Sequence, residues 1–120
     1  MKKKFFLNKN KLTKLPKSLC DLKHLQYLYV AQNQLTDLPE NFGDFAKQLQ
    51  KIVLSRNELE HFPTIEQPKH SNINMVILFG NKFSEEEIEQ IKNNLGFLIK
   101  TKDCSLDLGR KNKLNLHLYM

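Results

Sequence analysis

Apolar residues recur along the chain at intervals of 23 or 24 residues, and every interval holds the same short pattern. Four asparagines mark it, Asn10, Asn33, Asn57 and Asn81. An apolar residue follows each asparagine by two positions, at Leu12, Leu35, Leu59 and Phe83. Apolar residues also precede each by three, at Leu7, Val30, Leu54 and Leu78, and by five, at Phe5, Leu28, Ile52 and Val76. This self-similarity predicts a stack of repeated structural units.

The alternation before each asparagine predicts a short β-strand in every unit. Side chains two positions apart point to the same face of a strand, so the paired apolar residues share one side. A single unit of this size cannot cover that side by itself. The units must therefore stack, so that each covers the apolar face of its neighbour.

The pattern resembles the leucine-rich-repeat family, whose motif is LxxLxLxxNxL. The segment LQYLYVAQNQL at 25–35 carries every position of the motif, and LTKLPKSL at 12–19 resembles the LxxLP continuation of short bacterial-type repeats. The resemblance implies an α/β solenoid, a right-handed superhelix with a concave parallel sheet, in which the asparagine side chain bonds backbone groups of the turn after the strand. It also implies binding to another protein.

The register divides the chain into four repeats within 1–95, at about 2–24, 25–48, 49–72 and 73–96. A helix is predicted at 84–95, because Ser84 and Glu87 have the spacing of a capping box. Gly96 stands where helices commonly stop. In the third repeat, Pro68 and the loss of later leucines predict a loop without helix.

Residues 96–120 are predicted to form a C-terminal cap. FLIK at 97–100 predicts a strand, and the alternating leucines of 105–120 predict a β-hairpin that turns at 109–112. The hairpin leucines are out of register with the repeats, so this segment is not counted as a fifth unit. Such a hairpin would extend the edge of the sheet and cover it.

The first repeat is predicted to leave one end of the core open. The chain starts inside it, with Lys2 at a position that is apolar in the other repeats. Three explanations remain open: the lysines protect the end, the chain is a fragment, or a partner buries the end. The third includes homodimerisation.

The candidate binding site is the concave face, which comprises the strand side chains that point away from the core. Its three columns across the repeats are Lys4, Tyr27, Lys51 and Met75, then Phe6, Tyr29, Val53 and Ile77, then Asn8, Ala31, Ser55 and Phe79. The predicted partner-binding residues are Phe6, Tyr27, Tyr29, Lys51, Val53, Ser55, Met75, Ile77 and Phe79. The central column is apolar throughout, and an exposed apolar patch marks an interaction site. Alternatively, the hairpin covers Met75, Ile77 and Phe79, or β-branched residues are present only for strand propensity.

Charge supports a second function. The net charge is +6, and residues 1–24 hold eight lysines against one aspartate, so binding of RNA or an acidic membrane surface by the basic ends is an alternative. Lysine outnumbers arginine by 17 to 2, which disfavours nucleic acid because arginine suits bidentate phosphate recognition.

The sequence predicts no enzyme, no catalytic residue, no cofactor and no metal site. It contains no phosphate-binding glycine loop and none of the common hydrolase motifs. Cys20 and Cys104 lack the spacing of a zinc site or a disulfide framework, so a cytoplasmic location is predicted. No apolar run approaches the length of a membrane span.

Overall fold

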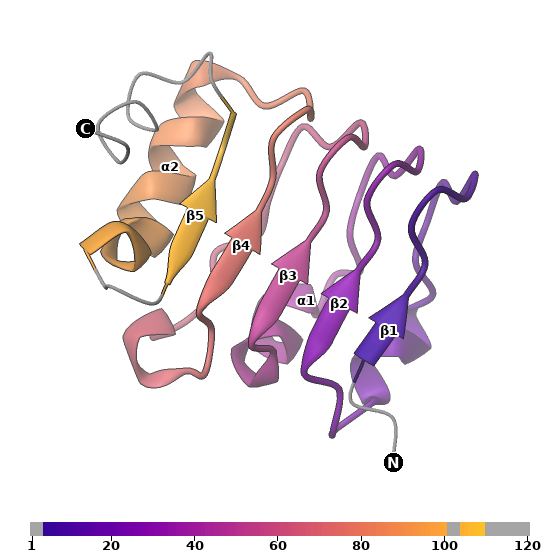
Figure 1. The fold of residues 1–120 in the computed structure, drawn as a ribbon, viewed down its shortest axis with the longest axis horizontal. Helices are drawn as coiled ribbons and strands as arrows, with labels where there is room; N and C mark the ends of the chain where they lie inside the picture. The colour runs from indigo at the N-terminus through magenta and orange to yellow at the C-terminus, as the bar shows by residue number, and fades with distance from the viewer. Residues whose placement is uncertain (1–3, 101–103, 110–120) are drawn as a thin grey trace.

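The computed structural model describes residues 4–100 and 104–109 of the chain. Its centre is one open parallel sheet, in which strands lie side by side in the order of the sequence (Figure 1). The strands are β1 (Lys4–Phe6), β2 (Tyr27–Tyr29), β3 (Lys51–Val53), β4 (Met75–Ile77) and β5 (Ser105–Asp107). The predicted parallel-sheet solenoid is therefore confirmed.

The strand register is the one that the repeat predicts. Phe5 pairs with Leu28, Leu28 with Ile52, and Ile52 with Val76, so equivalent positions of successive repeats are direct neighbours. Leu28, Ile52 and Val76 are completely buried. The middle residue of each three-residue strand thus points into the core, and its two neighbours form the opposite, concave face.

Short helical segments return the chain from one strand to the next on the other side of the sheet (Figure 1). They are η1 (Lys17–Asp21), α1 (Phe42–Phe45) with η2 (Ala46–Gln48), η3 (Pro68–His70), and α2 (Glu85–Leu95) with η4 (Gly96–Lys100). The 3-10 turn η3 corrects the expectation of a helix-free loop. Pro68 stands at its first position, where a proline needs no hydrogen-bonded N–H.

The core lies between the sheet and these return segments. Phe42 is completely buried, and its ring contacts Phe45 and Phe62 edge to face, at centroid distances of 5.9 and 6.1 Å. Phe62 belongs to the following repeat. The aromatic cluster therefore joins the second and third units beneath the sheet, as stacking of incomplete units requires.

The repeated asparagines connect each unit to the one before it. Asn57 is buried; its Oδ1 accepts a bond from the Leu35 N–H at 3.1 Å, and its Nδ2 donates to the carbonyls of Val30 at 2.8 Å and Leu54 at 3.0 Å. Asn81 makes the equivalent bonds, and Asn33 differs only in donating to the carbonyl of Ala31 within its own unit. A buried amide is stable only when it is bonded in this way.

A left-handed residue precedes each asparagine. Lys9, Gln32, Arg56 and Gly80 have φ values of 59°, 56°, 57° and 77°. The first three donate their N–H to a carbonyl of the following unit, at Ala31, Ser55 and Phe79. The turn thus directs the asparagine inward while keeping a hydrogen bond along the sheet.

Polar side chains attach α2 to the third repeat. Asn94 both accepts from the Ile65 N–H and donates to the Ile65 carbonyl, each at 2.8 Å. Ser84 caps the helix by accepting from the Glu87 N–H at 3.1 Å. Glu87 is only 9% exposed, and its carboxylate accepts from the Phe62 N–H at 2.8 Å, so it binds the neighbouring unit.

Two predictions for the C-terminal segment were wrong. Residues 97–100 are not a strand, because Gly96 keeps helical angles and the chain continues as η4 with Leu98 fully buried. β5 is also not out of register: Leu106 pairs with Val76 in a parallel ladder. The extra length before β5 is taken up by α2 and η4. The second half of the predicted hairpin lies outside the described residues.

The asparagine bonds predict a large cost for Asn57→Leu. The substitution leaves the Leu35 N–H and the Val30 carbonyl unpaired, so the free energy of unfolding should fall by about 1–3 kcal/mol. Chemical denaturation measures it. Asn10→Leu is the matched control, because Asn10 is exposed and bonds only carbonyls of its own unit. Equal losses in both variants would contradict this role.

The contact between the second and third repeats predicts a cost for Gly43→Ala. A Cβ at Gly43 would lie 2.6 Å from the Thr64 carbonyl oxygen, which is too close without a backbone shift. We expect a loss of about 1–3 kcal/mol in unfolding free energy. Gly96→Ala is the control, because a Cβ added at Gly96 would have no neighbouring atom within 4 Å. Alanine also favours a helix, so this substitution should be neutral or stabilising. A neutral Gly43→Ala would refute the tight contact.

Candidate partner-binding face

The register brings the predicted site residues into continuous rows on the concave face. One row runs Lys4, Tyr27, Lys51, Met75, Ser105, and the next runs Phe6, Tyr29, Val53, Ile77, Asp107. All of these side chains are partly or largely exposed. The structure thus brings together seven of the nine predicted residues, and Phe79, also partly exposed, lies just beyond β4.

Ser55 does not belong to this surface. Its exposure is only 5%, although the sequence placed it among the partner-binding residues. The regular strand β3 ends at Val53, so the alternation of side chains does not continue to Ser55. The chain then turns inward through Arg56 to the buried Asn57. At this one position the third column is therefore less accessible than alternation predicts.

Aromatic rings form the N-terminal part of the face. Phe6 stacks on Tyr29 across β1 and β2, with centroids 4.8 Å apart and planes 16° from parallel. Tyr29 meets Tyr27 edge to face at 6.4 Å. Phe6 remains 61% exposed, although it is one of the largest apolar side chains of the protein. The rings therefore support one another and still present an apolar surface to solvent.

Cationic groups border these rings. The Lys4 and Lys51 Nζ atoms lie 5.0 and 5.1 Å from the Tyr27 ring centroid, and the Arg56 guanidinium lies 5.7 Å from that of Phe79. Distances below about 6 Å are within the range of cation–π attraction. From the sequence, Lys4 was placed in its column but not predicted to bind the partner, because its contact with Tyr27 depends on the alignment of three strands.

The fifth strand adds residues that the sequence analysis missed. Ser105 and Asp107 extend the two rows beyond Met75 and Ile77. Asp107 Oδ1 accepts a bond from the Gly109 N–H at 3.0 Å, which fixes the carboxylate at the end of the strand. The signal was the alternation SLDL at 105–108. The face therefore has cations near its first strands and an anion on its last.

Reactive chemistry is sparse in the part of the chain that the structure describes. No group of three or more His, Cys, Asp or Glu side chains there could hold a metal ion. Burial, and secondly the charge of Asp21, raise the pKa of the Cys20 thiol, which disfavours the nucleophilic thiolate. None of the described helices is long and apolar enough to cross a membrane.

Comparisons with known proteins agree with this geometry. The family model described as Leucine Rich Repeat matches residues 24–45. A solved leucine-rich-repeat protein of Leptospira interrogans is similar over 88% of this chain, with 34% sequence identity and a TM-score of 0.74. The chain belongs to the leucine-rich-repeat family. Leucine-rich repeats commonly serve as protein-interaction modules. The present chain spans 25% of the length of the leptospiral protein.

The exposure of Phe6 predicts that this leucine-rich-repeat protein does not need it for folding. Phe6→Ala should lower the free energy of unfolding by only about 0.5–1.5 kcal/mol, the value of an aromatic pair. Phe42→Ala, in the core, should cost about 3–5 kcal/mol. Denaturation of both variants tests the difference. If Phe6→Ala lowered the free energy of unfolding as much as Phe42→Ala, the exposed rings would be needed for folding.

Proposed function

We propose that this leucine-rich-repeat protein binds a partner protein on its concave face and is not an enzyme. The observation that carries the proposal is the unbroken apolar row from Phe6 through Tyr29 and Val53 to Ile77. A surface of this kind is uncommon on proteins that have no partner.

The row lies outside the hydrophobic core of the repeats. The core is filled by the middle residue of each strand, such as Leu28 and Ile52, whereas the row lies on the opposite face. Strand propensity can explain the β-branched Val53 and Ile77. It does not require apolar rings at Phe6 and Tyr29, because a polar residue that favours strands would serve there equally well. Tyrosine is also enriched among residues that dominate binding energy.

The mode of binding follows from the sheet. Parallel strands with fixed register hold the side chains in place before a partner arrives, which lowers the entropic cost of association. A face of this size suits a contact of about 800 Å² on this side, the size of a standard interface. Lys4 and Lys51 add positive charge around Tyr27, which accelerates the approach of an acidic partner surface.

We further propose that the protein is non-enzymatic and cytoplasmic. The raised pKa of the Cys20 thiol supports a non-catalytic cysteine. The cytoplasmic setting rests on the sequence, in which two cysteines without a disulfide framework suit a reducing compartment.

A capture experiment tests the concave face. Wild-type protein and a Tyr29→Asp/Ile77→Asp variant are immobilised, and nuclease-treated lysate is passed over both. We expect a partner to bind the wild type and to be lost from the variant, because two charges interrupt the apolar row. The control is Gln90→Asp/Asn93→Asp, which adds the same charge on exposed positions of α2.

Crosslinking then locates the contact directly. A photoreactive phenylalanine analogue is placed at Val53 in one sample and at Gln90 in another. The captured protein should crosslink from Val53 and not from Gln90. Equal capture by wild type and the Tyr29→Asp/Ile77→Asp variant, or crosslinking from Gln90 alone, would refute the proposed site.

A further inference from the structure

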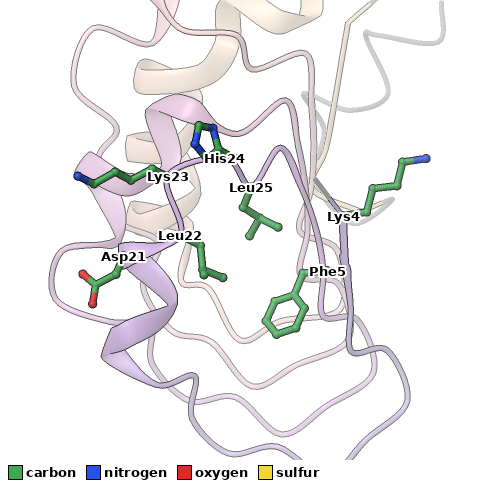
Figure 2. Close-up of a pocket in the computed structure, with 7 residues that line it drawn as sticks. All are labelled: Lys4, Phe5, Asp21, Leu22, Lys23, His24 and Leu25. Atoms are coloured by element: carbon green, nitrogen blue, oxygen red, sulfur yellow. The ribbon is translucent and has the colours of Figure 1, made fainter. Parts of the chain in front are cut away.

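A second surface lies at the end of the solenoid where β1 forms the edge of the described sheet. Beside it is a hollow of about 480 Å³, shown in Figure 2. Phe5, Leu22 and Leu25 point toward it from β1 and from the return segment after η1. Leu22 is 45% exposed, one of the most exposed large apolar residues of the described chain. Lys4, Asp21, Lys23 and His24 complete the lining.

The junction between the first two repeats shows which hydrogen bonds a repeat makes with the one before it. Asn33 of the second repeat binds the first repeat: its Oδ1 accepts the Leu12 N–H and its Nδ2 donates to the Leu7 carbonyl. The Gln34 N–H donates to the Leu12 carbonyl. In the other direction, the Leu7 N–H donates to the Tyr29 carbonyl.

The first repeat carries the same groups. Asn10 and Lys11 are the counterparts of Asn33 and Gln34, and both are exposed. Within residues 4–100 and 104–109, the Asn10 Oδ1 and the Lys11 N–H have no hydrogen-bond partner. The Phe6 carbonyl corresponds to that of Tyr29. This edge therefore carries the hydrogen-bonding groups of an internal junction, and none of the described strands pairs with it on that side.

A return-segment contact has a counterpart here too. In the second repeat, Gln48 Nε2 donates to the carbonyl of Leu22 in the first repeat at 2.6 Å, and to that of Leu25, where the second repeat begins, at 3.0 Å. The equivalent residue of the first repeat is His24, which lines the hollow and is exposed. Its ring N–H can donate to a carbonyl of an added chain in the same way.

Charge defines the chemistry of the occupant. Exposed lysines surround the hollow and the adjoining turn, at Lys4, Lys9, Lys11 and Lys23, and Asp21 is the only acid that lines the hollow. A second copy of the chain docked here would bring the same lysines face to face, and like charges at a contact are unfavourable. An acidic segment would be attracted.

We propose that this end binds an acidic strand of another protein, which adds parallel to β1 and carries leucines at the spacing of the repeat. Its leucines fill the hollow against Phe5 and Leu22. Its backbone N–H groups donate to the Phe6 carbonyl, and a backbone N–H two residues beyond its own asparagine position reaches Asn10 Oδ1. Strand addition at a free edge is a general mode of peptide recognition.

The probe is a capped synthetic peptide, LEELELEENEL, titrated into the isotope-labelled 120-residue chain and followed by backbone amide NMR. We expect shifts at Phe5, Asn10 and Leu22. Leu22→Glu should weaken binding about tenfold or more, because it places a charge in the apolar hollow and repels the acidic peptide. Gln90→Glu is the control with the same added charge and should bind like the wild type. Circular dichroism verifies that both variants are folded.

Five results would overturn the proposal. Equal binding of LKKLKLKKNKL would remove the role of charge, and equal binding of a scrambled acidic peptide would remove the role of the leucine spacing. Shifts centred on Tyr29 and Ile77 would move the contact to the concave face. Shifts at Asn10 and Leu22 caused by a uridine dodecamer or phosphatidylserine vesicles, but not by the peptide, would assign the basic end to RNA or membrane. Sedimentation of the chain alone as a dimer that Leu22→Glu dissociates would assign it to self-association.

Discussion

A buried amide must have its donors and acceptor satisfied, and in this protein a neighbouring repeat supplies partners for that purpose. Asn33, Asn57 and Asn81 each accept a backbone N–H from the preceding repeat and donate to one of its carbonyls. The register of the sheet and the direction of the turn follow from that pairing. Since the register in turn aligns Phe6 with Tyr29, the geometry of the concave face depends on side chains on the opposite side of the sheet.

Much of the fold could be predicted because repetition supplies independent copies of one pattern. The alternation at Leu28 and Val30 is ambiguous by itself, but its recurrence in phase with Asn57 and Asn81 fixes strand, face and neighbour together. The C-terminal segment lacks that support. FLIK at 97–100 fits a strand locally, yet burial of Leu98 one helical turn after Leu95 favours continuation of the helix.

The candidate site was predictable at the level of faces and less so at the level of contacts. Positions such as Tyr29 and Ile77 follow from alternation alone. The stacking of Lys4 and Lys51 on Tyr27 requires three strands to align, and the burial of Ser55 depends on where β3 ends, which alternation cannot locate. Asp107 was missed because the spacing before β5 differs from that of the repeats, so the segment was not counted as a fifth repeat.

The longer spacing before β5 has a consequence for how such a molecule can diversify. Leu106 keeps its place beside Val76 although α2 and η4 lengthen the return between them. The sheet thus keeps its hydrogen-bonded ladder even where the return segment on its outer side is longer. The number of strands in the sheet and the structure of the return segments can therefore change separately, in evolution or by engineering.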